Sequence, residues 1–151
     1  MEVNHEQKTK LIPQIKKHFN NDLKGKVIAF WGLSFKPHTD DIREAPSLYN
    51  IEELLKEGVT IRAHDPESMD NVKKILGSKI SYHETPYEAA NGADAIFIAT
   101  EWPEFRTPDF TKLIAMMKSK VIFDGRNLYE LRDMKDQGFT YISIGRKTIH
   151  A

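Results

Sequence analysis

The sequence of 151 residues contains no cysteine. This absence excludes a disulfide framework, a thiolate metal site and cysteine-based catalysis within this chain. An excess of charge of one sign is also absent, because 22 Lys and Arg residues face 22 Asp and Glu residues. Without a net charge, no global field attracts nucleic acid or an anionic membrane. Any site for an anion must therefore be local, and must depend on a few cationic side chains.

A long hydrophobic run is missing as well. The longest apolar stretch is far too short to cross a bilayer, and Met1 is not followed by the apolar region of a signal peptide. We therefore expect a cytoplasmic protein that makes no contact with a membrane. Apolar residues make up 40% of the chain and charged residues 29%, which is an ordinary balance for a globular domain.

From Lys26 onwards, short apolar segments alternate with amphipathic ones. The apolar segments predict six buried strands, at residues 26–32, 59–65, 79–83, 93–100, 120–125 and 140–145. Helices are predicted between them, at residues 46–57, 66–76, 110–117 and 128–135, with a short one from Pro86. This alternation predicts an α/β fold, with a doubly wound, mostly parallel, six-stranded Rossmann-like sheet and right-handed crossovers.

A shared signal marks the start of three predicted helices. A side chain that can cap a helix precedes proline at Asp65-Pro66, Thr85-Pro86 and Thr107-Pro108. Thr85 and Glu88 also have the spacing of a capping box. We expect the helices to begin at these prolines.

The first twenty residues differ from the rest of the chain. Leu11, Ile12, Ile15 and Phe19 fall on one face of a predicted helix. Pro13 lies within that pattern, so the helix must start late or bend there. An apolar stripe needs a packing partner, and we expect this partner to lie in a part of the protein that the sequence does not contain.

Ligands of doubly wound sheets bind outside the carboxyl ends of the strands, where the strand order reverses. The loop after the first strand contains Gly32 alone, whereas a dinucleotide cradle needs the spacing G-x-G-x-x-G. We therefore do not expect it to bind NAD as such a cradle does. Lys36 and Arg43 could supply charge for a phosphate from their side chains, or they are solvated loop residues. Asp40 and Asp41 favour a turn, or pairing with Arg43, over a metal site.

The loops after the fourth and fifth strands add aromatic and cationic residues. Trp102 and Phe105 could form a stacking wall for a base, or pack in the core. Glu101 could accept hydrogen bonds from a ligand, or orient Arg106. Gly125 permits a tight turn that projects Arg126 over the sheet end, although a plain turn explains the same residues. Taken together, cations and aromatic residues at one sheet edge suit a nucleoside diphosphate.

Other polar residues at strand ends receive no role in the site. Asp65 follows the second strand, where an acid often binds a ribose, but helix capping accounts for it. His64 and His83 have no partner at the spacing of metal ligands. We expect no metal site in this chain.

Three segments resemble a known family. Residues 32–47 read GLSFKPHTDDIREAPS, residues 99–110 read ATEWPEFRTPDF, and residues 121–127 read VIFDGRN. In this order and at this spacing they resemble the C-terminal, UDP-binding domain of the UDP-glucose dehydrogenases, within the UDP-glucose/GDP-mannose dehydrogenase family. The resemblance covers nearly the whole chain.

The resemblance implies a specific activity for the longer protein. The family's UDP-glucose branch oxidises UDP-glucose twice with NAD to give UDP-glucuronate, and its catalytic cysteine lies before the C-terminal domain. An N-terminal domain holds NAD, and a central linker helix forms a homodimer. By this resemblance, residues 1–24 are the end of the linker helix and residues 25–151 the UDP-binding domain. The chain then depends on those absent domains as partners, and has no catalytic residue and no activity by itself.

The resemblance also implies roles for individual residues. Phe35 and Lys36 match residues that contact the nucleotide sugar, and Arg126 matches an arginine at the UDP-sugar. Arg43 matches an arginine that reaches across a cleft to NAD. By the same likeness, Asp40, Asp41 and Glu44 hold the loop in shape.

Two alternatives stay open. The first is the same domain of a dehydrogenase that acts on GDP-mannose or a UDP-N-acetylhexosamine, although the segment TEWPEFR resembles the UDP-glucose branch more closely. The second is a stand-alone nucleotide-binding module. The apolar stripe near the N-terminus argues against this module, because it resembles the end of a longer helix.

Overall fold

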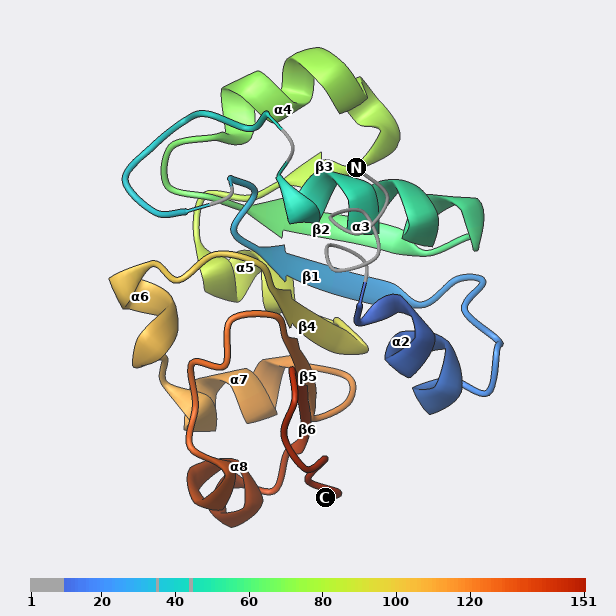
Figure 1. The fold of residues 1–151 in the computed structure, drawn as a ribbon, viewed down its shortest axis with the longest axis vertical. Helices are drawn as coiled ribbons and strands as arrows, with labels where there is room; N and C mark the ends of the chain where they lie inside the picture. The colour runs from blue at the N-terminus through green and yellow to red at the C-terminus, as the bar shows by residue number, and fades with distance from the viewer. Residues whose placement is uncertain (1–9, 35, 44) are drawn as a thin grey trace.

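The fold is described from a computed structural model, and the description applies to residues 10–34, 36–43 and 45–151. Within these residues one sheet contains the strands β1 (Val27–Trp31), β2 (Thr60–His64), β3 (Ser81–Tyr82), β4 (Ala95–Ile98), β5 (Val121–Asp124) and β6 (Thr140–Ser143). The strands lie in the order β3-β2-β1-β4-β5-β6, and each neighbouring pair is parallel (Figure 1). The predicted α/β, six-stranded, Rossmann-like sheet is therefore confirmed.

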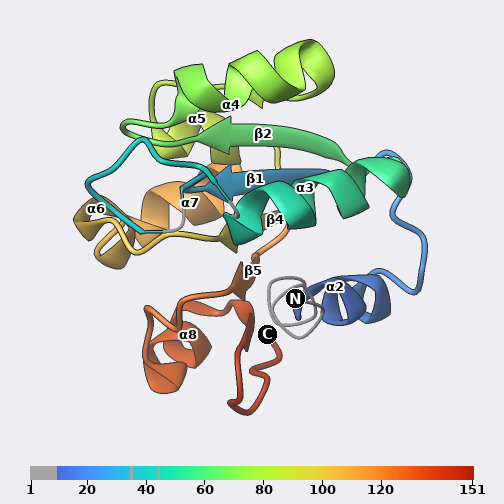
Figure 2. The same ribbon diagram turned by 45° about the horizontal axis from the view of Figure 1, so that its top comes forward.

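Helices cover both faces of the sheet (Figure 2). One face carries α2 (Ile12–His18), α3 (Pro46–Lys56) and α4 (Met69–Leu76), and the other carries α5 (Pro86–Ala90), α7 (Phe110–Met116) and α8 (Leu131–Gln137). A short helix, α6 (Pro103–Arg106), follows β4, and a 3₁₀ turn, η1 (Gly77–Lys79), follows α4. In the part of the chain described here, no helix is long and apolar enough to cross a membrane.

Alternation along the strands divides the core into two clusters. In β1, Ile28 and Phe30 join the cluster beneath α3, whereas Ala29 and Trp31 join the cluster on the opposite face. Phe30 stacks on Phe97 of β4, with 4.5 Å between the ring centroids. Because successive side chains of a strand point to opposite faces, a central strand that is apolar throughout must be buried on both.

The N-terminal helix packs against this same domain, so the expectation that its partner lies outside the chain is wrong. Leu11, Ile12 and Ile15 belong to the core cluster beneath α3. The rings of His18 and Phe19 contact the ring of Phe123 in β5, at centroid distances of 5.8 and 6.3 Å. The stripe is satisfied internally because the helices that follow β1 and β2 leave this part of the face for α2 to cover.

The start of α2 agrees with the sequence. The helix begins at Ile12, so that Pro13 lies in the first turn, where its missing N–H breaks no helical hydrogen bond. The assignment of residues 1–24 to a linker helix stays a prediction, and residues 1–9 lie outside the described part of the chain.

One of the three predicted helix starts is confirmed. Thr85 caps α5, and its hydroxyl accepts a hydrogen bond of 3.0 Å from the N–H of Glu88. The helix predicted at residues 110–117 is confirmed as α7, but it begins at Phe110, so the start predicted at Thr107-Pro108 is wrong. Asp109 caps it instead.

The start predicted at Asp65-Pro66 is also wrong. Helix α4 begins three residues later, at Met69. The cause is Asp65, whose Oδ1 accepts hydrogen bonds from the N–H groups of Glu67 and Ser68, at 2.8 and 2.7 Å. These bonds fold residues 65–68 into a separate turn that precedes the helix.

The outer edge of β6 is covered by the end of the chain. Ile149 forms an antiparallel bridge with Tyr141, and the two residues exchange backbone hydrogen bonds of 2.8 and 2.9 Å. The N–H of Ala151 adds a bond of 3.1 Å to the hydroxyl of Thr140. Strand β6 is therefore paired on both sides at this point.

We predict that α2 is an integral part of the domain. The substitution Ile15→Ala should lower the free energy of unfolding by roughly 2–5 kcal/mol, because it opens a cavity at a fully buried position. Urea denaturation followed by circular dichroism measures the loss. Lys17→Ala, at an exposed position of the same helix, is the control and should change stability by less than about 0.5 kcal/mol. An equally small effect of Ile15→Ala would mean that α2 does not pack on the sheet.

Candidate functional site

The strand order reverses between β1 and β4, which are neighbours in the sheet although β2 and β3 separate them in sequence. The chain leaves β1 towards one face and β4 towards the other. The loops that follow β1, β4 and β5 therefore meet at the carboxyl edge of the sheet, where ligands of such folds bind. This is the edge that the sequence singled out.

The loops after β1 and β4 touch at Gly32. This glycine has φ +97°, and a Cβ built on it would lie 2.3 Å from the hydroxyl oxygen of Thr100. The same hydroxyl donates a hydrogen bond of 2.7 Å to the carbonyl of Ser34. Gly32 is therefore required for close packing of one loop on the other.

Asp65, which follows β2, fixes the start of the loop after β1. Its carboxylate is fully buried, and Oδ2 accepts a hydrogen bond of 2.8 Å from the N–H of Leu33. The hydroxyl of Ser47 donates a hydrogen bond of 2.5 Å to the carbonyl of Leu33. Since Oδ1 of Asp65 caps the turn before α4, both oxygens are used inside the protein, which agrees with leaving Asp65 out of the ligand site.

The middle of the β1 loop is held against α4. The side chain of Asn71 donates a hydrogen bond of 2.8 Å to the carbonyl of Asp40, and Ser68 donates one of 3.2 Å to the carbonyl of Thr39. In Figure 1 the loop (cyan) accordingly extends outwards beside α4. Lys36 is exposed on it, which leaves its ammonium group accessible. Phe35 and Glu44, for which roles were expected, lie outside the described residues.

Arg43 is paired with Asp41, as the sequence suggested. The guanidinium Nε and Nη2 atoms donate hydrogen bonds of 3.1 and 2.9 Å to the two carboxylate oxygens, and the backbone N–H of Arg43 adds a third of 3.0 Å. The hydrogen bonds from Arg43 lower the pKa of Asp41 to about 2, and the charge of Lys36 acts in the same direction. The arginine side chain is 87% exposed, so this pair holds its cation in solvent at the tip of the loop.

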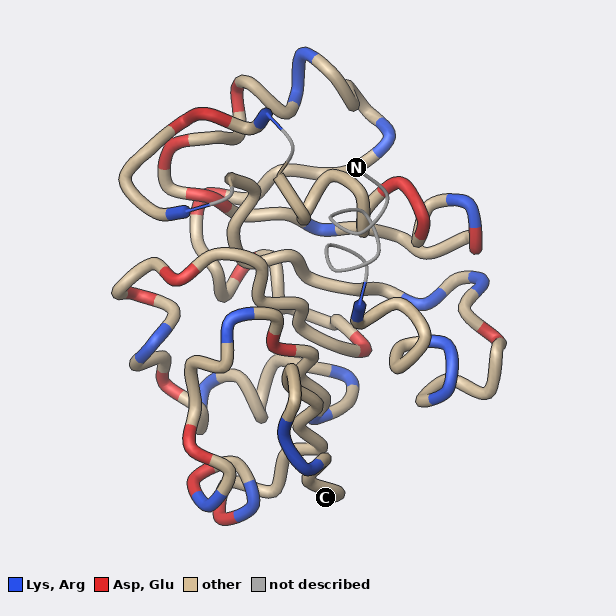
Figure 3. The backbone as a smooth tube through the Cα atoms, in the orientation of Figure 1, with Lys and Arg blue, Asp and Glu red and all other residues tan. Residues whose placement is uncertain are grey.

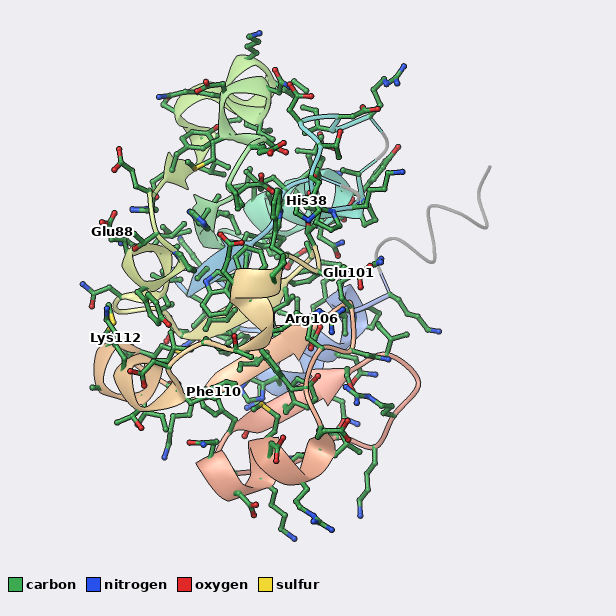
Figure 4. All side chains as sticks on the ribbon, turned by 90° about the vertical axis from the view of Figure 1, so that its left-hand side faces the viewer. His38, Glu88, Glu101, Arg106, Phe110 and Lys112 are labelled. Carbon is green, nitrogen blue, oxygen red and sulfur yellow. The ribbon has the colours of Figure 1, made fainter. Side chains whose placement is uncertain are left out.

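A second charged cluster lies where the β4 and β5 loops meet. Glu101 accepts a hydrogen bond of 2.7 Å from Arg126 on Oε1 and one of 3.1 Å from Arg106 on Oε2. Of the two alternatives for Glu101, the contact with Arg106 is therefore confirmed. The sharing of this carboxylate with Arg126 was not predicted from the sequence. Glu101 and Arg106 are labelled in Figure 4, beside α6.

Asp124 positions the backbone of Arg126. The aspartate is fully buried; Oδ1 accepts a hydrogen bond of 2.8 Å from the N–H of Arg126, and Oδ2 accepts one of 2.8 Å from the N–H of Leu128. Tyr141 donates a further bond of 2.6 Å to Oδ2. Burial raises the pKa of Asp124, and these hydrogen bonds oppose the rise. The turn after β5 is thus more than a surface turn, because a buried carboxylate organises it.

Arg146 completes this buried network and was missed from the sequence. Its guanidinium donates hydrogen bonds of 2.7 Å to the hydroxyl of Tyr141, 2.9 Å to the carbonyl of Tyr129 and 3.0 Å to the hydroxyl of Ser143. Burial raises the pKa of both tyrosines. A signal was present, because a cation just after the last strand must lie at the same sheet edge, but only the loops after the first, fourth and fifth strands were considered.

The aromatic residues near the site are mostly core residues. Phe105 is fully buried and stacks on Trp31 at 5.4 Å, so the core-packing alternative is confirmed for it. Trp102 is also buried, and the ring of His38 contacts it edge-on at 4.8 Å. His38, labelled in Figure 4, is itself exposed.

Charge is local in this molecule. Acidic and basic residues are interspersed over the backbone (Figure 3). The predicted cations fall into two clusters that each contain a carboxylate: Lys36 and Arg43 lie with Asp41 on the β1 loop, and Arg126 lies with Glu101 and Arg106 on the loops after β4 and β5. Within residues 10–34, 36–43 and 45–151, no group of His, Asp and Glu is arranged to hold a metal ion. The chemistry that this edge offers is the binding of an anion.

A family model matches most of the chain. It describes the UDP binding domain of the UDP-glucose/GDP-mannose dehydrogenase family, and it matches residues 29–131. The match runs from β1 to the start of α8, and so includes the loops after β1, β4 and β5.

Known proteins are similar over nearly the whole chain. A UDP-glucose 6-dehydrogenase of Pseudomonas aeruginosa is 43% identical over 148 residues, which are 95% of this chain and 33% of that protein. A UDP-glucose 6-dehydrogenase of Bacillus subtilis is 38% identical over 149 residues, 99% of this chain and 34% of that protein. The chain thus spans about a third of the length of these relatives.

Solved structures show the same fold. A UDP-glucose dehydrogenase of Pyrobaculum islandicum matches with a TM-score of 0.71 at 28% identity, over 95% of this chain and 29% of that one. A UDP-D-ManNAc dehydrogenase of Pyrococcus horikoshii matches with a TM-score of 0.71 at 29% identity, over 92% of this chain and 30% of that one. The fold therefore occurs in dehydrogenases of more than one UDP-sugar.

The contact between the β1 and β4 loops predicts a large cost for a side chain at Gly32. Gly25 also has a positive φ, of +80°, but a Cβ there would meet open space. Gly25→Ala should cost about 1–2 kcal/mol for backbone strain alone. Gly32→Ala should cost roughly 1–3 kcal/mol more, because Thr100 must move. Urea denaturation of the two variants measures the difference, and equal losses would show that the close contact is unimportant.

The Asp41–Arg43 pair predicts an acidic titration. In an NMR titration the carboxyl of Asp41 should titrate near pH 2, and in Arg43→Ala its pKa should return towards 3.8. Since the folded pKa is lowered, any stabilisation from this group is complete above the unfolded pKa and is lost as the pH falls from about 4 to 2. Arg132→Ala, which removes an exposed cation from α8, should leave the midpoint in place. An Asp41 midpoint near 4 in the unchanged protein would refute the pairing.

Proposed function

The chain belongs to the UDP-glucose/GDP-mannose dehydrogenase family, and we propose that it binds the UDP part of a UDP-sugar for a longer dehydrogenase. The observation that carries this proposal is the position of Arg126. Its backbone is fixed by the buried Asp124, and its guanidinium already holds a carboxylate at the carboxyl edge of the sheet. A phosphate oxygen is the same kind of acceptor for an arginine fork.

Lys36 and Phe35 are proposed to contact the nucleotide sugar from the β1 loop. Lys36 is exposed beside Asp41 and Arg43, so its ammonium group can move towards a diphosphate. Arg43 extends from the same loop into solvent, and we propose that it reaches NAD held by another domain. The hydrogen bonds from Asp41 keep its guanidinium in one orientation before that domain closes.

NAD is the proposed cofactor of the longer protein, but the β1 turn of this chain does not fit its pyrophosphate. A dinucleotide approaches the backbone where glycines leave space. At Gly32 that space is filled by Thr100. We therefore assign to this chain no NAD cradle, and only the contact from Arg43.

The proposed reaction of the longer protein is the oxidation of UDP-glucose to UDP-glucuronate. Relatives that are 43% and 38% identical to the chain are UDP-glucose 6-dehydrogenases, which supports UDP-glucose over GDP-mannose or a UDP-N-acetylhexosamine. This chain has no cysteine to act as a nucleophile, so we propose that it is inactive by itself. Its proposed partners are the N-terminal and central domains of a cytoplasmic homodimer.

A stand-alone nucleotide-binding module is the second candidate. The burial of Leu11, Ile12 and Ile15 in the core of this domain favours it, because the apolar stripe no longer requires an external partner. Neither candidate changes the proposed ligand of the sheet edge, which is UDP in both.

Calorimetric titration of the chain with UDP, UDP-glucose, GDP and NAD tests the proposal. UDP and UDP-glucose should bind, and Arg126→Ala should weaken them by roughly 1.5–3 kcal/mol, the contribution of a charged hydrogen bond. The melting temperature should change little, because the backbone N–H of Arg126 keeps its hydrogen bond to Asp124 and Glu101 keeps its pair with Arg106.

Arg132→Ala removes a cation of the same kind from the exposed face of α8 and should leave binding unchanged. A large loss of stability with intact UDP binding in Arg126→Ala would mean that this arginine only supports the turn. Equal binding of GDP and UDP would refute the assignment of the base.

A further inference from the structure

One carboxylate is shared by two arginines at the proposed phosphate site. Glu101 lies between Arg126 on Oε1 and Arg106 on Oε2, at 2.7 and 3.1 Å. We call these three residues the Glu101 fork. Their side chains are 34%, 30% and 51% exposed for Glu101, Arg126 and Arg106 respectively, so water screens the charges only in part.

The charges of the fork explain why two arginines are present. If Glu101 and Arg126 stood alone, their charges would cancel, and the site would not attract a phosphate. If a phosphate bound Arg126 in place of Glu101, the carboxylate of Glu101 would be left unpaired beside the phosphate. The two negative charges would then repel each other. With Arg106 on the second oxygen, the fork carries one net positive charge, and Glu101 stays paired when Arg126 turns to the ligand.

From this arrangement we propose that Arg106 is a positioning residue of the phosphate site, which acts through Glu101 without touching the ligand. The inference rests on the proposed function, because it takes a phosphate as the anion that competes with Glu101 for Arg126.

The fold holds the backbones of both arginines through contacts that lie outside the Glu101 fork. Phe105, the neighbour of Arg106 in α6, is fully buried in the second core cluster, and its carbonyl accepts a hydrogen bond from the hydroxyl of Tyr129. Arg126 is anchored by Asp124 at the end of β5. Since neither backbone depends on the fork, the side chains can exchange partners without moving the loops.

A double-mutant cycle on the full chain tests the proposal, with UDP and inorganic pyrophosphate as ligands. Arg106→Gln should raise the Kd for both by about 3- to 10-fold at low salt, and by less at high salt, the scale of a partly screened ion pair. Arg106→Lys, which keeps the charge, should bind within about 2-fold of the unchanged protein. Arg132→Gln is the matched control for loss of a distant arginine and should have no effect.

Removal of the Glu101 charge decides whether Arg106 acts through it. In an E101Q background, Arg106→Gln should no longer weaken binding, because no carboxylate remains to be neutralised. An equal loss in both backgrounds would mean that Arg106 contacts the ligand itself, and would overturn the proposal. Unchanged binding in the single Arg106→Gln variant would overturn it as well.

A measurement without ligand separates this inference from the proposed function. The NMR signal of the Arg126 Nε–H group should shift on Arg106→Gln in the unchanged background, and should stay in place on the same change in E101Q. If the chain bound neither UDP nor pyrophosphate, the proposed function of the isolated chain would fail. The NMR signals would still show whether Arg106 acts on Arg126 through Glu101. If the Arg126 signal did not shift on Arg106→Gln in the unchanged background, the coupling between the two arginines would be refuted.

Discussion

The structure depends on the handedness of its crossovers. Parallel strands joined through right-handed connections must place successive helices on one face until the strand order reverses. In this chain the reversal falls between β1 and β4, so α3 and α4 cover one half of a face and leave the rest bare. Helix α2 fills that remainder with Ile15 and its neighbours. The same reversal brings the β1, β4 and β5 loops together, and so creates both the core and the site.

Buried carboxylates organise the site from within, while exposed cations face outwards. Asp65 and Asp124 each accept three hydrogen bonds from groups inside the protein, and each fixes a loop at the sheet edge. Burial of a carboxylate without hydrogen-bond partners costs free energy of folding. With its partners in place, the carboxylate fixes the positions of the groups that donate to it. Since these acids are fully engaged, the groups left for a ligand are the cations they position, above all Arg126.

Sequence patterns located the strands well, because the alternation of apolar residues reports burial directly. They also located Lys36, Arg43 and Arg126 at one edge, since topology alone places strand ends together. The partner of α2 could not be predicted, because an apolar stripe shows that a helix needs a partner without showing which one. The Asp65-Pro66 pair misled for a similar reason: a capping residue can close a turn as well as begin a helix. The sharing of Glu101 depends on side-chain directions across two loops, which no local pattern encodes.

The short bridge between Ile149 and Tyr141 has a consequence for how molecules of this protein can meet. An outer strand with unpaired backbone groups is a template on which another chain can add its own strand, and this leads to aggregation. Here Ile149 occupies that template at Tyr141 of β6, and at the opposite margin β3 is only two residues long. Growth of the sheet from one molecule into the next is thus blocked at one margin and poorly supported at the other. Helical and loop surfaces, where side chains rather than backbone groups select a partner, are thus favoured over the sheet margins for any contact between molecules.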